Sequence, residues 1–439
     1  MELVWRVSPA VGVVIAMQQS NDKPAWRLPA IAGLILALAA SAAGVEVVRG
    51  PYLQSLHSAG VTICARVREP APLIVTIWRG DELMRQISSR SALDHTFTVD
   101  GLVPDTTYQY CLQFGDARRE YVNFRTAPAK GAAARIWVMG DGGTSLVDAR
   151  AVRDAYERRK LDPTLILMLG NNAYPDGTDG QFQQSVFDHF APRLAETPFY
   201  STRGNHARHA DVYYQIHVNP KSGEAGGVAS ESEAYYSADH GPAHLVCLDS
   251  SGTRLETDGK MMAWLRRDLA AAQSPWVIAF CHHPPYSGGS HGSDNCADSG
   301  GRLCQLRERF IPVLEEFGVD LMLTGHSHAY ERTGLIHGHY GPSRTFAPEL
   351  HVVGEGAPGK NGVRYRKAPG RAAGTVYVVV GSSGKLIPIG KPHPAMAVSI
   401  SDMGSMHLDV SATKLTGSFV DKKGRVRDTF SITKAAVRQ

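Results

Sequence analysis

The segment VMGDGGTS, residues Val138 to Ser145, ends an apolar run on a single carboxylate followed by two glycines. A short apolar run of this kind is typical of a buried strand. Asp141 either closes a tight turn or holds a ligand at the end of that strand, where the two glycines would let the ligand approach the backbone. The rest of the sequence decides between these two interpretations.

Similar polar clusters follow other apolar runs along the chain. From Arg135 onward, apolar runs alternate with helical stretches such as KMMAWLRRDLAAAQ, which predicts α/β layering. In α/β sheets, ligands bind beyond the carboxyl ends of the strands. Five clusters at the same topological position favour a ligand site over five unrelated turns. They are GDGG (140–143), GNNAYPDG (170–177), RGNHARH (203–209), CHHPPY (281–286) and TGHSHAYER (324–332).

The length and composition are those of an ordinary globular protein. The chain has 439 residues, enough for two domains, with 20% charged and 43% hydrophobic residues. Its formal net charge of +4 is small and scattered. We therefore expect no nucleic-acid-binding surface.

The N-terminal residues 1–43 read as a signal peptide. Lys23 and Arg27 precede an apolar stretch whose strongest part, Ile31 to Ala40, is about half the roughly 20 residues that a membrane span needs. Ala40 and Ala42 fit a cleavage site, which predicts export to the periplasm or the medium. An uncleaved N-terminal anchor is the alternative, and no later run is apolar enough for a span in the mature chain.

The six cysteines would meet an oxidising environment after export. Cys64 and Cys111 fall on the outward faces of different predicted sheets, so we do not expect them to pair. Cys296 and Cys304 flank a short loop and are better candidates for a disulfide. The remaining two lie in apolar strands and are expected to be buried thiols.

Residues 46–127 alternate short β-rich runs with turn signals, the pattern of a small β-sandwich. Within them, GLVPDTTYQY resembles the turn and tyrosine corner of fibronectin type III-like domains, with Tyr108 at the corner. Strand patterns return near the C-terminus, where residues 401–435 are predicted to form a hairpin region that packs on the α/β domain.

The order of the motifs D-x-G, G-[D]-x-x-Y, G-N-H, H-x-P-x-Y and G-H-x-H resembles that of metallophosphoesterases, and specifically of purple acid phosphatases. The resemblance implies an α/β fold, a calcineurin-like β-sandwich flanked by helices over residues 133–400, preceded by the small all-β domain. It also implies an acid phosphatase, a dinuclear-metal hydrolase of phosphate monoesters in which metal-bound hydroxide attacks phosphorus.

The resemblance further assigns the metal ligands. One metal would be held by Asp141, Tyr174 and His328, and the other by Asn205, His282 and His326. An anionic phenolate and a carboxylate favour Fe(III), whereas the imidazole-rich set suits a divalent ion, Zn, Fe or Mn. Two metals about 3.5–4 Å apart can clamp the attacking and leaving oxygens of a phosphate ester.

Four further histidines lie in or near these motifs. His206 resembles the residue that contacts phosphate and protonates the leaving alkoxide. His291, nine residues after His282, matches a phosphate-binding histidine of some family members, and its alternative role is that of a loop histidine. His283 and His209 are expected to line the pocket rather than bind metal.

Asn171 stands where the family has an aspartate that bridges both metals. A carboxamide offers one neutral oxygen, and its NH₂ group repels a cation, so metal binding should weaken. Three interpretations of Asn171 follow. The protein is a natural but slower enzyme, it is a pseudoenzyme, or the asparagine is a deliberate substitution or a sequence error. We favour native-like geometry with impaired activity. A phosphodiesterase acting on nucleotides and a catalytically silent phosphate- or partner-binding protein are the alternative functions.

Overall fold

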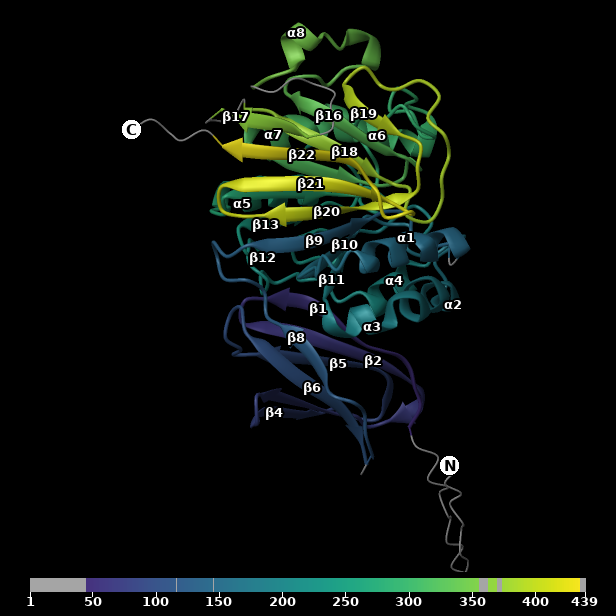
Figure 1. Ribbon diagram of the computed structural model, residues 1–439, viewed down its shortest axis with the longest axis vertical. Helices are drawn as coiled ribbons and strands as arrows, with labels where there is room; N and C mark the ends of the chain where they lie inside the picture. The colour runs from purple at the N-terminus through teal and green to yellow at the C-terminus, as the bar shows by residue number, and fades with distance from the viewer. Residues whose placement is uncertain (1–44, 116, 145, 355–361, 369–372, 435–439) are drawn as a thin grey trace, which may run out of the picture. The chain divides into compact units, whose positions relative to one another are not determined.

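The computed structural model describes residues 45–434, apart from 116, 145, 355–361 and 369–372 (Figure 1). The predicted signal peptide, residues 1–43, lies outside the described residues. The described residues form one compact unit. It contains an N-terminal all-β part and a larger mixed α/β part, and this confirms the predicted fold class.

The N-terminal part consists of two packed sheets whose facing residues, among them Leu53, Ile63 and Val75, form its core. The hydroxyl of Tyr108 accepts a hydrogen bond of 2.9 Å from the backbone N–H of Val103, which is the geometry of a tyrosine corner. One sheet comprises β1 (Val47–His57), β2 (Gly60–Ala71) and β5 (Ala92–Asp100), and the other β4 (Glu82–Ser88), β3 (Ile74–Arg79), β6 (Thr107–Phe114), β7 (Ala117–Arg118) and β8 (Val122–Arg125).

The α/β part contains two seven-stranded sheets that face each other across the largest apolar cluster. In spatial order, the first sheet runs β11 (Phe199–Ser201), β10 (Leu165–Met168), β9 (Ala134–Met139), β20 (Gly404–Val410), β21 (Lys414–Asp421), β22 (Val426–Lys434) and β17 (Val363–Lys367). The second runs β12 (Tyr236–His240), β13 (Ala243–Cys247), β14 (Trp276–Phe280), β15 (Leu321–Thr324), β18 (Thr375–Val380), β16 (Tyr330–Ile336) and β19 (Met396–Ile400).

Helices cover the outer faces of both sheets. Trp137 of β9 stacks on Tyr156 of α1 with ring centroids 4.0 Å apart, and this anchors the helix to the first sheet. The α-helices are α1 (Val147–Arg158), α2 (Asp179–Phe182), α3 (Asp188–Glu196), α4 (Ala210–Ile216), α5 (Lys260–Ala271), α6 (Arg302–Gln305), α7 (Ile311–Glu316) and α8 (Pro348–His351). Short 3-10 or π-helical segments are η1 (Gln183–Phe187), η2 (Asp298–Gly301), η3 (Leu306–Phe310) and η4 (Ser343–Thr345).

The C-terminal strands are part of the first sheet. β20 lies between β9 and β21, so residues 404–434, drawn in yellow in Figure 1, continue the sheet that carries Asp141. A buried ion pair joins them to the second sheet, because Arg332 of β16 donates to both carboxylate oxygens of Asp428 at 2.6 and 2.9 Å. Bidentate geometry of this kind fixes orientation as well as charge.

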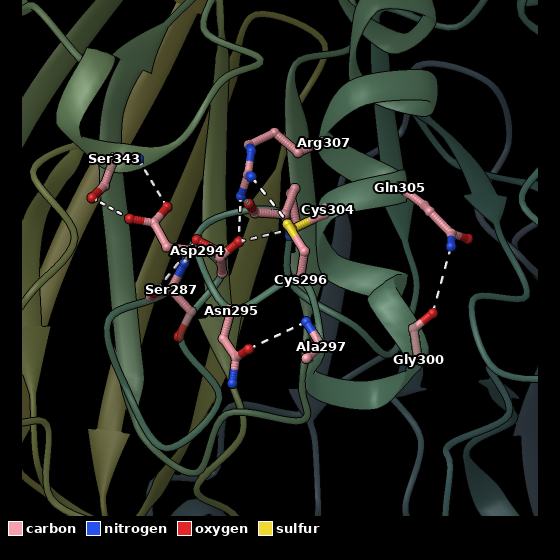
Figure 2. Close-up of a disulfide and its surroundings, with 12 residues drawn as sticks. Ser287, Asp294, Asn295, Cys296, Ala297, Gly300, Cys304, Gln305, Arg307 and Ser343 are labelled. Atoms are coloured by element: carbon pink, nitrogen blue, oxygen red, sulfur yellow. Dashed lines mark hydrogen bonds between the residues drawn. A yellow bond between two sulfur atoms is a disulfide. The ribbon is translucent and has the colours of Figure 1, made fainter.

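The cysteines form a single disulfide, between Cys296 and Cys304, as the sequence predicts (Figure 2). The other four are free and buried. Cys64 points away from the core of its own sandwich, in agreement with its alternation, but it is not exposed because it packs in a cluster with Tyr52 and Trp137. Cys111 is also buried, so the prediction that both side chains face outward holds only relative to the sandwich core.

One buried histidine makes the stability of the fold depend on pH. His244 of β13 lies between two carboxylates, with its Nδ1 2.8 Å from Asp239 and its Nε2 2.8 Å from Asp268. Burial alone would lower the pKa of His244, but the two carboxylates outweigh it and raise the pKa to about 9. The folded protein therefore binds this proton more tightly than the unfolded chain does.

We expect this contribution to stability to be complete below about pH 6.5, the ordinary pKa of histidine, and to be lost as the pH rises through about 9. The shift corresponds to roughly 3 kcal/mol in the free energy of unfolding. Urea denaturation of the metal-free wild type should show this decline, and His244→Gln should lack it. If the free energy of unfolding fell equally with rising pH in the wild type and in His244→Gln, the assignment to His244 would be contradicted.

Candidate metal centre

The predicted ligands lie at the ends of strands. Asp141 follows β9, Asn171 follows β10 and Asn205 follows β11, and these three strands are parallel neighbours in the first sheet. His282 and His326 follow β14 and β15, parallel neighbours in the second. The carboxyl ends of the two strand sets therefore bring five of the predicted site residues together.

The backbone at three of these positions adopts a conformation that side chains rarely take. Asp141, Asn171 and His326 have φ values of +56°, +54° and +66°. Residues in the left-handed region are held there by their surroundings, and they concentrate at functional sites. The sharp turn after each strand aims the side chain back over the end of the sheet.

Two glycines allow the motifs to close on one another. A Cβ atom on Gly204 would lie 2.2 Å from the Oδ1 of Asn171, and one on Gly325 would lie 2.6 Å from the Oδ2 of Asp141. Any larger residue would displace the side chains of the site. The glycines before Asn205 and His326 therefore serve close approach to the neighbouring polar groups. In VMGDGGTS itself, Gly143 serves close approach to the backbone of the next motif, because a Cβ there would lie 2.2 Å from the carbonyl carbon of Asn172.

The first group of predicted ligands, called here the first triad, consists of Asp141, Tyr174 and His328. The Oδ1 of Asp141 lies 2.9 Å from the Tyr174 hydroxyl and 3.6 Å from the Nε2 of His328, and the latter two atoms are 3.3 Å apart. Burial and the charge of Asp141 raise the pKa of Tyr174, so without a cation its hydroxyl donates to the carboxylate.

The second triad consists of Asn205, His282 and His326. The Oδ1 of Asn205 lies 2.8 Å from the Nε2 of His282 and 3.2 Å from the Nδ1 of His326, and the two nitrogens are 3.2 Å apart. Asn205 is exposed, so this side of the site is open to solvent.

The protonation of His282 follows from its partners. Its Nδ1 lies 2.8 Å from the carbonyl oxygen of Leu169, which can only accept a hydrogen bond, so Nδ1 carries the proton. Burial lowers the pKa of His282, so the ring is neutral and its Nε2 holds a bare lone pair. That lone pair faces the carbonyl oxygen of Asn205. Two acceptors in contact repel each other, and a cation between them would remove the repulsion.

The dimensions of both triads also fit metal ions. Bonds of about 2.1 Å place neighbouring ligand atoms about 3.0 Å apart at octahedral angles and about 3.4 Å apart at tetrahedral angles. The edges of the second triad, 2.8 to 3.2 Å, and of the first, 2.9 to 3.6 Å, lie near these values. The six residues of the two triads therefore fit two metal ions in donor chemistry and in size.

Asn171, which lies between the triads, does not fit the role of a bridging metal ligand. The Nδ2 of Asn171 donates to the Oδ1 of Asp141 at 2.9 Å and to the Oδ1 of Asn205 at 3.1 Å, one ligand from each triad. Its Oδ1 accepts a bond of 2.9 Å from the backbone N–H of His206. Rotating the amide would turn its NH₂ group toward that N–H, so the orientation is fixed. Asn171 thus presents protons where a bridging carboxylate would present an oxygen.

His206 and His291 lie beside the triads. The half-buried ring of His206 is 4.5 Å from that of Tyr174, and its Nδ1 lies 2.7 Å from the carbonyl of Pro175. His291 stacks on His326 with ring centroids 4.0 Å apart. In His206 the Nδ1 proton is committed to the carbonyl, which leaves Nε2 for a substrate.

The other two histidines differ in their surroundings. His283 is buried with its ring 4.4 Å from that of His326, and its Nδ1 contacts the Ser250 hydroxyl at 2.9 Å. His209 is exposed at the start of α4. The position of His283 is that of a residue packed behind the ligands, whereas that of His209 is peripheral.

The sequence analysis missed Asp298 and Ser299. The hydroxyl of Ser299 lies 2.8 Å from the Nε2 of His326, and a carboxylate oxygen of Asp298 lies 2.8 Å from the Nδ1 of His291. Burial would raise the pKa of Asp298, but the hydrogen bonds from Ser299 and His291 outweigh it and lower the pKa. Neither residue stands in a motif, and the signals that could have drawn attention to this segment are the neighbouring cysteines and His291, which precedes Asp298 by seven residues.

Residues 134–330 match the family model described as calcineurin-like phosphoesterase. The chain is 27% identical over 285 residues to purple acid phosphatase 23 of Arabidopsis thaliana, covering 56% of this chain and 59% of that protein. It is 28% identical over 265 residues to purple acid phosphatase 1 of Ipomoea batatas, covering 56% and 53%. The chain thus spans little more than half the length of these curated relatives.

Two solved structures share the fold. A purple acid phosphatase, PPD1, from yellow lupin (Lupinus luteus) seeds aligns with a TM-score of 0.67 at 15% identity, covering 89% of this chain and 74% of its own. PhoD aligns with a TM-score of 0.64 at 13% identity, covering 89% and 91%. At these identities the likeness concerns the arrangement of the chain, and the chemistry has to be argued from the site.

Proposed function

Because residues 134–330 of this chain match the calcineurin-like phosphoesterase family model and the chain is similar to purple acid phosphatases, we propose that the protein is an exported, dinuclear-metal hydrolase of phosphate monoesters. The observation that carries this proposal is the convergence of two triads of ligand atoms at the ends of neighbouring strands. Each triad presents the donor types and spacing of a metal site.

Asp141, Tyr174 and His328 would hold Fe(III), since a carboxylate and a phenolate suit a hard trivalent ion. Asn205, His282 and His326 would hold a divalent ion, Zn, Fe or Mn. When bound, the two ions would supply a nucleophile from water and offset the charge that develops on the phosphoryl group.

Two histidines beside the triads would contact the substrate directly. His206 has its Nδ1 proton fixed on the Pro175 carbonyl, so its Nε2 is the atom that contacts phosphate and protonates the leaving alkoxide. His291 has its Nδ1–H fixed on Asp298, so its Nε2 would bind a phosphate oxygen as the second N–H donor of an imidazolium. Both rings lie next to a proposed ligand, His206 beside Tyr174 and His291 on His326.

Export is proposed from the sequence of residues 1–43, and the disulfide supports an oxidising destination. Among the described residues, no helix has the length and apolar character needed to cross a bilayer.

A catalytically silent phosphate-binding protein is the second candidate, because the Asn171 amide puts protons between the two triads. Metal content and turnover separate the two functions. The hydrolase should bind metal and release p-nitrophenol from p-nitrophenyl phosphate, faster than from bis-p-nitrophenyl phosphate. A preference for the diester would indicate a phosphodiesterase instead, and no turnover of either substrate would indicate the silent protein.

The first triad gives a prediction about iron. Asp141→Ala and His328→Ala should each abolish binding of the trivalent ion, because each removes one of three ligands. Tyr174→Phe should remove the visible charge-transfer absorption expected of an Fe(III)–phenolate pair. The measurements are elemental analysis and the visible spectrum, with the peripheral His209→Ala as control. A full iron complement in Asp141→Ala would exclude this residue from the metal site.

A further inference from the structure

The loop closed by the Cys296–Cys304 disulfide reaches the candidate metal centre with two side chains. Asp298 and Ser299 lie inside this loop, and they contact His291 and His326. Neither belongs to the five motifs.

The contacts of Ser299 fix the proton on His326. The hydroxyl of Ser299 donates to the Oδ1 of Asp298 at 2.7 Å, so its oxygen accepts the bond of 2.8 Å from the Nε2 of His326. The His326 proton is therefore on Nε2, and its Nδ1 carries the lone pair that faces the other members of the second triad. A partner on the far nitrogen sets which nitrogen of a histidine can bind metal.

The same carboxylate also holds His291. The Oδ2 of Asp298 lies 2.8 Å from the Nδ1 of His291, whose ring stacks on His326 at 4.0 Å. One side chain thus orients a proposed metal ligand through Ser299 and a proposed phosphate contact directly.

The loop itself is held at both ends (Figure 2). Cys304 lies in α6, and Cys296 is bonded to it across eight positions of sequence. The buried guanidinium of Arg307 donates to the carbonyl of Ser293 at 2.6 Å, just before the loop. Ser299 has a φ of +51°, so it depends on this framework to keep its conformation.

We propose that Asp298 and Ser299 are positioning residues that present His326 as an Nδ1 metal ligand and His291 as a phosphate contact, and that the Cys296–Cys304 disulfide holds them in place. This inference rests on the proposed function, since it assigns roles around the same metal centre. It also separates two properties of the site. Ser299 contacts only the proposed metal ligand His326, so its removal should change metal affinity without changing phosphate affinity.

The test titrates Zn²⁺ into metal-free protein and, separately, measures inhibition of turnover by inorganic phosphate. Ser299→Ala should lower Zn²⁺ affinity by about 10–100-fold, the range for removing a partner behind a metal-bound histidine, and should leave phosphate inhibition nearly unchanged. Asp298→Asn should weaken both, because it disturbs both rings. Replacing Cys296 and Cys304 together by serine should also weaken both.

Asp294→Asn is the matched control. It removes the same charge from the same stretch of chain, but the Asp294 carboxylate accepts from the N–H and hydroxyl of Ser343 and contacts no histidine of the site. It should change neither affinity. Melting temperatures of all variants monitor folding, and should Asp298→Asn fail to fold, Ser299→Ala and the control decide the outcome.

Unchanged Zn²⁺ affinity in Ser299→Ala, or an equal loss in Asp294→Asn, would overturn the positioning role while wild-type metal binding and turnover remain. If neither the wild type nor Asn171→Asp binds Zn²⁺ or hydrolyses a phosphate ester, the proposed function is overturned instead, and this inference falls with it. The two failures are therefore distinguishable.

Discussion

Asn171→Asp is expected to raise the turnover of phosphate monoesters by roughly 100-fold, a change of about 2.7 kcal/mol in the activation free energy. In the wild type, the amide NH₂ of Asn171 donates to Asp141 and Asn205, one ligand from each triad. A carboxylate would keep one oxygen on the His206 N–H and place the other between the two metal positions. It would add a negative charge between two cations in a partly dry site, where charge counts for more than in water.

The comparison is made at acidic and at neutral pH with p-nitrophenyl phosphate. Asn172→Asp is the control, because it makes the same change one residue away. The Asn172 amide is buried and donates to the Ser201 hydroxyl at 2.8 Å rather than to a proposed ligand. If Asn171→Asp leaves turnover and metal affinity as they are, its position is no metal bridge and the two-metal account fails, although the fold stands.

His206→Ala is expected to lower kcat by about 10²–10⁴-fold for substrates with poor leaving groups, the range for general acid catalysis. Alkyl phosphates depend on protonation of the leaving oxygen, whereas p-nitrophenolate leaves with little help. The loss should therefore be much smaller for p-nitrophenyl phosphate.

The measurement is kcat of wild type and variant for both substrate types. His209→Ala, three residues along the chain, exposed and outside the triads, is the control and should leave both values unchanged. Equal losses on the two substrate types would mean that His206 binds phosphate without acting as an acid.

Local pattern was enough to place the ligands at strand ends. The apolar runs before Asp141, Asn171 and His326 form the strands β9, β10 and β15, in agreement with the prediction that short apolar runs followed by glycine are typical of buried strands. The motif order then indicated that the ends meet. The backbone N–H of His326 donates to the carboxylate of Asp141, so strand ends 185 residues apart in the sequence are in direct contact.

The support around the ligands could not be predicted in the same way. Asp298 and Ser299 lie in a loop without periodicity, and only the folded chain shows that Ser299 reaches the far nitrogen of His326. The burial of Cys64 depends on packing against side chains such as Trp137, distant in sequence. Alternation reports which face of a strand a residue occupies, but not what later covers that face.

The metal content of Asn171→Asp after exhaustive dialysis tests the central claim most directly. Six side chains in two triads should retain two ions per chain once a carboxylate bridges them, and the wild type should retain fewer. One ion or none in the variant would contradict the account, because the two triads would then not be the two halves of a dinuclear centre.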